Sequence, residues 1–291
     1  MGRIYDALQQ AERERMNGSA PARVNDDLDL RHELPATGME PAAAVLSALS
    51  RPLSLTEEGS GLSAHPHPEA RACMWSPQPG FGAEAFRRLA WELEQWTGKT
   101  PPRVLLITSA GANEGKTTVA LNLAAALARS GRRRVLLLEA SPQPRLAARL
   151  GVEVRGGLAD WLCNQEPVQR FCVRLEPWPL YLLPAGEGGW NLENLCAAPI
   201  RELLTQLRQE LDWIVLDGPA LLPVAEAQHW AQWVDGVLLV ARAGISRKPE
   251  LAEAWRRVAE EKRLGWVLNQ ADSAAGKALM ETARREDQHG E

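Results

Sequence analysis

The sequence predicts an α/β protein with a doubly wound, mainly parallel sheet flanked by helices, of the P-loop nucleoside-triphosphatase class with a deviant phosphate-binding loop. From Phe81 onward, short continuous apolar runs alternate with amphipathic segments, which is typical of parallel strands buried between two layers of helices. The first of these runs leads directly into a loop with glycine and lysine that opens a helix, which is the setting a phosphate-binding loop requires.

Strands are expected where apolar residues follow one another without a polar break. Such runs lie at 103–108, 134–139, 180–183, 213–217, 236–241 and 264–269. Helices are expected between them at 82–96, 116–129, 199–210 and 249–261. The helix over 116–129 should end at Gly131, because glycine is the common residue just beyond a helix C-terminus.

The chain is expected to have four parts. Residues 1–16 have the spacing of a short amphipathic helix, and residues 17–80, rich in Pro, Ala, Gly and Ser, are expected to form a flexible linker. Residues 81–275 hold the P-loop domain, and residues 276–291 form a polar tail.

Composition and the distribution of apolar residues argue against nucleic-acid-binding, membrane-spanning and secreted proteins. The 291 residues have a formal net charge of −4, which does not favour a nucleic-acid-binding surface. No stretch approaches the roughly 18 apolar residues of a membrane-spanning helix, and the charged N-terminus lacks the apolar core of a secretory signal. We therefore expect a cytoplasmic protein with no nucleic-acid partner.

The segment TSAGANEGKTT at 108–118 is predicted to bind the phosphates of a nucleotide. Gly115 lets the backbone approach the phosphates, and Lys116 brings a positive charge to them. The hydroxyl of Thr117 is placed to bind Mg²⁺. Ala110 stands where the strict G-x-x-x-x-G-K-[ST] pattern has its first glycine, but Gly111 follows and Asn113 tolerates a positive φ. The nucleotide-binding residues that we expect are Gly111, Asn113, Glu114, Gly115, Lys116, Thr117, Thr118 and, at the end of the last strand, Asn269.

Two acidic residues end apolar strands. Asp217 ends the run at 213–217 and is expected to hold Mg²⁺ together with Thr117, because sites in open parallel sheets lie at the carboxyl ends of the strands. Glu139 ends the run at 134–139 and could hold a metal-bound water or accept a proton. The candidate catalytic residues are therefore Lys116, Glu139 and Asp217, with ATP and Mg²⁺ as cofactors.

A series of motifs resembles the bacterial tyrosine kinases of exopolysaccharide and capsule synthesis, a P-loop family, over roughly residues 84–270. These motifs are EAFRRL at 84–89, SAGANEGKTTVALNLAAALARSG at 109–131, GLADWL at 157–162, LPAG with NLENL at 183–195, DWIVLDGPALLPVAEA at 212–227, DGVLLVARAG at 235–244 and GWVLN at 265–269. The resemblance implies an ATP-dependent protein-tyrosine kinase. It also implies a membrane polysaccharide chain-length or co-polymerase protein as partner, contacted at the inner membrane from the cytoplasm, and a possible homo-oligomer.

The sequence departs from the family pattern at four places. Glu139-Ala140-Ser141 replaces the usual Asp-x-Asp, so the second carboxylate is lost. Ala220 replaces the second proline after Asp217, and Ala90 replaces the last arginine of the subunit-contact motif that resembles E-x-x-R-x-x-R. The family's C-terminal tyrosine cluster is absent, since the only tyrosines are Tyr5 and Tyr181.

Three functions therefore remain open at this point. The first is a protein-tyrosine kinase that acts on another protein or on Tyr5. The second is a nucleotide-dependent regulator or scaffold of a polysaccharide export complex with weakened catalysis, which the lost acidic residue and the missing tyrosine cluster favour. The third is an ATPase of the partitioning type, although Gly111 stands where such proteins have a signature lysine.

Overall fold

The computed structural model describes residues 62–66, 72–77, 80–96, 101–141, 146–163, 166–186 and 197–271. The expected N-terminal helix at 1–16, most of the expected linker and the polar tail at 276–291 lie outside these residues. Tyr5 does so as well.

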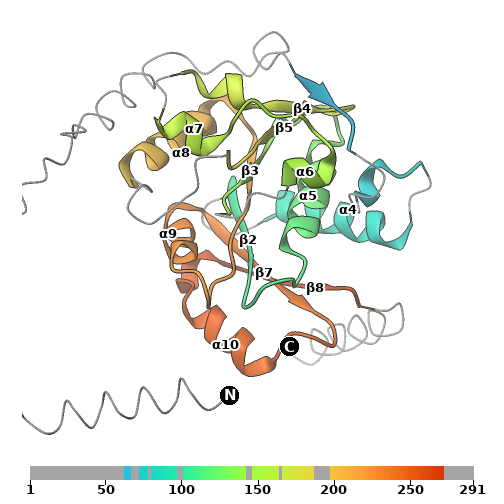
Figure 1. Cartoon of the computed structure of the whole chain (residues 1–291). Helices are drawn as coiled ribbons and strands as arrows, with labels where there is room; N and C mark the ends of the chain where they lie inside the picture. The colour runs from blue at the N-terminus through green and yellow to red at the C-terminus, as the bar shows by residue number, and fades with distance from the viewer. Residues whose placement is uncertain are drawn as a thin grey trace, which may run out of the picture. The chain divides into compact units, whose positions relative to one another are not determined.

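The described residues form an eight-stranded sheet with the strand order β1-β4-β5-β3-β6-β2-β7-β8 (Figure 1). Neighbouring strands are parallel except for the antiparallel pair β4 and β5. The strands are β1 (Ser63–Ala64), β2 (Val104–Ser109), β3 (Val135–Glu139), β4 (Val173–Leu175), β5 (Leu180–Leu183), β6 (Trp213–Asp217), β7 (Gly236–Arg242) and β8 (Arg263–Asn269). The predicted mainly parallel sheet is confirmed.

Helices cover both faces of this sheet, as Figure 1 shows on either side of β2 and β3. One face is covered by α4 (Phe81–Glu94), α5 (Lys116–Ala128) and α6 (Leu146–Leu150). The other is covered by α7 (Leu158–Cys163), α8 (Ala197–Glu210), α9 (Glu226–Trp233) and α10 (Lys248–Arg256). Short 3₁₀ helices lie at η2 (Cys73–Trp75), η3 (Val168–Phe171) and η4 (Glu260–Lys262).

The central strands are buried on both faces, which is why they read as unbroken apolar runs. In β2, Val104 and Leu106 pack into the core under α7 to α10, whereas Leu105 and Ile107 pack into the core under α4 to α6. Successive side chains of a strand point to opposite faces, so each run supplies both cores. The doubly wound arrangement is therefore confirmed.

Part of the range expected as a linker belongs to the folded domain. Ser63 and Ala64 pair with β4, which extends the sheet by one strand. Met74, in η2, is 3% exposed and donates its backbone N–H to Asn122 Oδ1 in α5 at 3.2 Å. The expected linker at 17–80 is thus too long at its C-terminal end, because two- and three-residue elements have no periodicity that a sequence pattern can detect.

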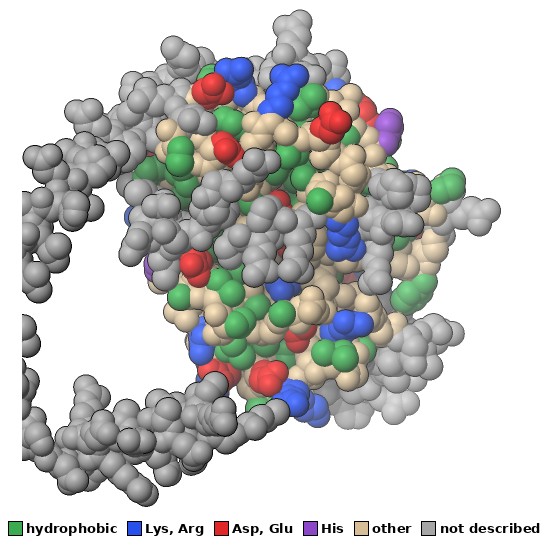
Figure 2. Space-filling view, in the orientation of Figure 1, with side chains coloured by type: hydrophobic (Ala, Val, Ile, Leu, Met, Phe, Trp, Pro, Cys, Tyr) green, Lys and Arg blue, Asp and Glu red, His purple; other side chains and the backbone are tan. Residues whose placement is uncertain are grey.

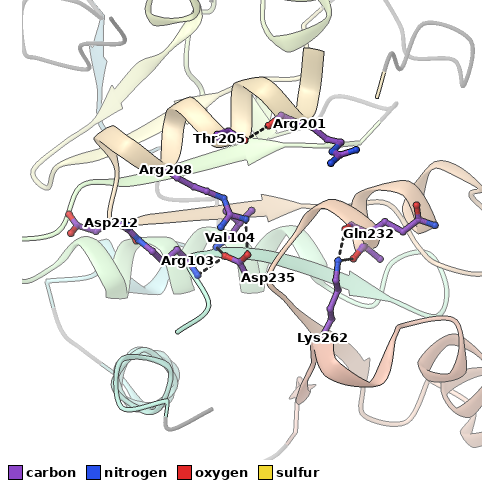
Figure 3. A network of polar contacts seen from close by, with 10 residues as sticks. Arg103, Val104, Arg201, Thr205, Arg208, Asp212, Gln232, Asp235 and Lys262 are labelled. Atoms are coloured by element: carbon purple, nitrogen blue, oxygen red, sulfur yellow. Dashed lines mark hydrogen bonds and ion pairs between the residues drawn. The ribbon is translucent and has the colours of Figure 1, made fainter. Parts of the chain in front are cut away.

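A polar network fixes the amino ends of the strands, at the edge of the sheet where β2 and β7 begin (Figure 3). One oxygen of Asp235 accepts the backbone N–H groups of Arg103 and Val104 at 3.0 and 2.9 Å. Its other oxygen accepts Arg208 Nη2 from α8 at 2.7 Å. Arg103 Nη2 in turn donates to the carbonyl of Leu211 at 2.8 Å. The network therefore joins β2, β7 and α8 at the end of the sheet opposite to the carboxyl ends of the strands.

Charged side chains of both signs are dispersed over the face that Figure 2 shows. Within the described part of the chain, no helix combines the length and the hydropathy needed to cross a bilayer.

Candidate nucleotide-binding site

A cavity of about 1010 Å³ opens at the carboxyl ends of the central strands. In the sheet, β3 and β7 lie on opposite sides of the pair β6 and β2. The strands that follow β2 in the chain are therefore placed on both sides of it. Such a switch in strand order leaves a crevice between the loops, which is where open α/β sheets bind ligands. The predicted site residues that line the cavity are Asn113, Gly115, Lys116, Thr117, Thr118, Glu139, Asp217 and Asn269.

The loop between β2 and α5, residues 110–115, is called the glycine loop here. Its backbone adopts positive φ at Asn113 (60°) and at Gly115 (100°). A Cβ atom at Gly115 would lie 1.8 Å from Asn269 Nδ2, so no other residue fits this position without movement. The glycine thus leaves room for Asn269 as well as for the close approach of a phosphate.

Side chains from β7 and β8 brace the glycine loop. Asn269 Nδ2 donates to the carbonyl of Glu114 at 3.0 Å, and Arg242 Nη1 donates to the carbonyl of Asn113 at 3.2 Å. Ser246, just beyond β7, donates its hydroxyl to the Glu114 carboxylate. The loop is therefore held in one shape by segments distant in sequence, and the role of Ser246 has no signal in the sequence.

Glu114 and Gly111, both predicted to contact the nucleotide, do not line the cavity. Glu114 is buried at 3% exposure, and its other carboxylate oxygen accepts the Gly111 N–H at 2.8 Å. A carboxylate beside phosphates would repel them. The Glu114 side chain instead points into the loop, where it is hydrogen-bonded to Gly111 and Ser246 and avoids this repulsion. The side chain of Glu114 belongs to the support of the loop.

Lys116 begins α5, and its ammonium group lies within the glycine loop. Its Nζ donates to Ser109 Oγ at 3.0 Å and to the carbonyl of Gly111 at 3.3 Å. Burial lowers the pKa of Lys116, while the nearby carboxylates of Asp217 and Glu114 act in the opposite direction. The two hydrogen bonds hold the ammonium group within the glycine loop, near the carboxylates of Asp217 and Glu114.

Asp217 ends β6 and lies beside the end of β3, where its register partner is Glu139. Burial raises the pKa of Asp217 to about 7, and the charge of Glu139 adds to this effect. A hydrogen bond from the Thr117 hydroxyl and the charges of Lys116 and Arg149 oppose it. A crowded, buried carboxylate is stabilised by a further cation, and a carboxylate with a hydroxyl is the oxygen donor set that Mg²⁺ prefers. Thr117 and Asp217 therefore fit a magnesium ion.

Glu139 anchors two neighbouring segments. Its Oε1 accepts the backbone N–H of Leu146, the first residue of α6, at 2.7 Å, and its Oε2 accepts that of Ala185 at 3.2 Å. The residue is buried, at 2% exposure. Ser141, two residues further on, also lines the cavity. The carboxylate at the first acidic position thus has a clear task in holding the chain together at this end of the cavity.

Arg149 lines the cavity but was not identified from the sequence. It lies in α6, and its Nη2 donates to Thr118 Oγ1 at 2.9 Å. A five-residue helix gives too short a pattern to be predicted, and nothing in the sequence marks one arginine among many. The remaining tyrosine of the described chain, Tyr181, lies inside β5 with 4% exposure, so it cannot accept a phosphoryl group in the folded protein.

Comparisons with known proteins agree with this geometry. The family model described as the CobQ/CobB/MinD/ParA nucleotide binding domain matches residues 105–290. The chain is 29% identical over 209 residues to the succinoglycan biosynthesis transport protein ExoP of Rhizobium meliloti, a match that covers 70% of this chain and 26% of ExoP. It is 28% identical over 193 residues to the tyrosine-protein kinase YwqD of Bacillus subtilis, which covers 65% of this chain and 81% of YwqD. The chain therefore spans about a quarter of the length of ExoP but most of YwqD.

Solved structures give the same picture. The kinase domain of VpsO is similar with a TM-score of 0.59 and 31% identity, over 65% of this chain and 94% of that domain. The kinase domain of the Escherichia coli tyrosine kinase ETK is similar with a TM-score of 0.59 and 26% identity, over 66% of this chain and 78% of that one.

Proposed function

Because the chain belongs to the CobQ/CobB/MinD/ParA nucleotide-binding domain family and is homologous to bacterial tyrosine kinases of exopolysaccharide and capsule synthesis, we propose that it binds Mg-ATP and transfers the γ-phosphate to a tyrosine of another protein. The observation that supports this most is the convergence of Lys116, Thr117 and Asp217 on one cavity at the switch point of the sheet.

Each of the three residues has a role that its surroundings favour. Mg-ATP would supply the phosphoryl group and the metal charge. Lys116, already held against the glycine loop, neutralises charge on the phosphates, while Thr117 and Asp217 provide oxygen ligands for the metal. Positioning and charge neutralisation account for most of the catalysis of phosphoryl transfer, so this set matches the needs of the reaction.

The acceptor that we propose is a tyrosine of a different protein. Tyr181 is enclosed in the sheet with 4% exposure, so its hydroxyl is not accessible in the folded domain. We further propose a cytoplasmic protein that meets a membrane co-polymerase protein at the inner membrane and that forms homo-oligomers. These partners follow from the resemblance to the family alone.

A second function is favoured by the residues Glu139-Ala140-Ser141, which replace the Asp-x-Asp of the family. Glu139 accepts two backbone N–H groups, and Ser141 stands where the family has a second carboxylate. A site that binds Mg-ATP but lacks this carboxylate suits a nucleotide-dependent regulator of a polysaccharide export complex. A partitioning-type ATPase is the least supported candidate, because Gly111 occupies the place of the signature lysine.

One assay separates these functions. The purified full-length chain is incubated with γ-labelled ATP, Mg²⁺ and a tyrosine-bearing acceptor, and the label is followed. Label on tyrosine supports the kinase, release of phosphate alone supports an ATPase, and retention of bound, intact ATP supports the regulator. The kinase proposal fails if Lys116→Ala leaves the tyrosine label unchanged.

A further inference from the structure

The cavity has two chemically different ends. One end is formed where β7 and β8 finish, with the amide side chains of Asn269 and Gln270. The other is formed at the end of β3 and by α6, with Ser141 and Arg149. Since β6 and β2 separate β3 from β7 in the sheet, Lys116 and its neighbours on α5 and β6 lie between the two ends. An elongated nucleotide that lies across Lys116 therefore extends toward both.

Arg149 is anchored at its end of the cavity by the packing of α6 and by a hydrogen bond. The flanking residues Leu146 and Leu150 are fully buried, so α6 is fixed on the core. The N–H of Leu146 is bound by Glu139 at 2.7 Å, which secures the start of the helix to the end of β3. Arg149, between the two leucines, donates from Nη2 to Thr118 Oγ1 on α5 at 2.9 Å. The guanidinium group is thus placed against the helix that carries Lys116 and Thr117.

The other arginine on the cavity wall does different work. Arg242 donates from Nε to Gln270 Oε1 at 2.7 Å and from Nη1 to the carbonyl of Asn113 at 3.2 Å. The first bond joins β7 to Gln270, just beyond the end of β8, and the second joins β7 to the glycine loop. Arg242 therefore supports the glycine loop at the amide-bearing end, whereas Arg149 places a cation at the end with the acidic residues.

We infer that Arg149 binds the terminal phosphate of the nucleoside triphosphate, and that Glu139 is the residue that positions it. The inference rests on the proposed binding of Mg-ATP. The amide-bearing end suits the nucleoside, whose ring atoms and hydroxyls are hydrogen-bonding groups, and this directs the phosphate chain past Lys116 toward Arg149. A guanidinium group has five N–H donors in a planar fork, so it can hold Thr118 and a phosphate oxygen at the same time. Arg149 then supplies, from the same chain, positive charge for the terminal phosphate.

A purely structural role for Arg149, as a link between α6 and α5 through Thr118, predicts a different result. Loss of such a link lowers the stability of the protein and reduces its affinity for all nucleotides alike. Loss of a contact with the terminal phosphate reduces the affinity for ATP and leaves the affinity for ADP unchanged. The ratio of the two affinities is therefore the informative quantity.

Isothermal titration calorimetry of the full-length chain with Mg-ATP and with Mg-ADP measures this ratio. We expect Arg149→Gln to reduce the affinity for ATP by about tenfold or more and the affinity for ADP by less than about twofold, because a charge-assisted bond to one phosphate is lost. Arg149→Lys, which keeps the charge without the fork, should give an intermediate ratio. Arg155→Gln is the matched control, since Arg155 is exposed, close in sequence and absent from the cavity wall, and it should leave both affinities unchanged.

The outcomes separate this inference from the proposed function. If the wild-type chain binds neither nucleotide, the proposed binding of Mg-ATP itself fails. If the wild-type chain binds ATP and Arg149→Gln leaves the ATP-to-ADP ratio unchanged, the assignment of Arg149 is wrong while nucleotide binding stands.

The positioning role of Glu139 is tested by a double-mutant cycle in the same titrations. Glu139→Gln keeps the shape of the side chain but replaces one hydrogen-bond acceptor by a donor, so it should loosen α6 and lower the ATP-to-ADP ratio severalfold. In the Arg149→Gln background it should have little further effect on that ratio. Equal effects of Glu139→Gln in both backgrounds would show that Glu139 does not act through Arg149.

Discussion

At the scale of single residues, the site depends on Gly115, because the neighbouring Asn269 leaves no room for a side chain at this position. Gly115 has φ of 100°, and Asn269 fills the space where a side chain would project. Asn269 is also bonded to the Glu114 carbonyl, so it cannot move aside without loosening the glycine loop. The sequence identified Gly115, Lys116 and Thr117 together because they are contiguous in one motif. It could not identify Arg149 or Ser246, whose roles arise only when distant segments fold together.

We expect Gly115→Ala to destabilise the protein by about 1–3 kcal/mol, because the substitution forces a positive φ and displaces Asn269. Gly111→Ala is the matched control in the same loop, since its φ is not positive and no atom lies within 4 Å of the added Cβ. Chemical denaturation of both variants checks the prediction. Equal stability of the two variants would show that the glycine loop is not constrained by Asn269.

At the scale of elements, length decided what the sequence could predict. The long apolar runs of β2, β3, β6 and β7 were found within one or two residues, because burial on both faces leaves a continuous apolar pattern. The edge strand β8 was also found within one residue, although it is only partly buried. The helix expected at 249–261 ends earlier, at Arg256, and is followed by η4. The short elements β1, β4, α6 and α7 have too few residues to show a periodic pattern of apolar residues. Their positions depend on interactions with other segments, as in the pairing of β1 with β4 and of β4 with β5.

The network at the amino ends of the strands should contribute to stability without affecting the site. Asp235→Ala removes the acceptor for two backbone N–H groups and for Arg208, so we expect a loss of about 1–3 kcal/mol in the free energy of unfolding. Glu260→Ala, which removes a carboxylate that is 89% exposed and paired with Arg263 at 3.5 Å, is the control and should have almost no effect. Urea unfolding measures both. Nucleotide affinity should remain that of the wild type, since the network lies at the opposite end of the strands, and a large loss of affinity would contradict this separation.

At the scale of the whole molecule, the order of the strands gathers residues that lie far apart in the chain. The doubly wound fold brings the ends of β2, β3, β6, β7 and β8 to one edge, so that a single cavity collects a lysine, two acidic residues and two arginines. The predicted fold class followed from the alternation of elements and is confirmed. The arrangement of the cavity wall could not be predicted, because it depends on the strand order and on short segments such as α6.

The central claim is that this cavity binds Mg-ATP through Lys116, and thermal unfolding of the full-length chain tests it most directly. A ligand that binds only the folded state stabilises it, by about 2.7 kcal/mol at a hundred times its Kd. We predict a rise in the melting temperature with saturating Mg-ATP, a smaller rise when magnesium is chelated, and no rise for Lys116→Ala. Lys248→Ala, an exposed lysine at the start of α10, should respond like the wild type. A wild-type chain that Mg-ATP does not stabilise, or a Lys116→Ala chain that it stabilises equally, would contradict the account.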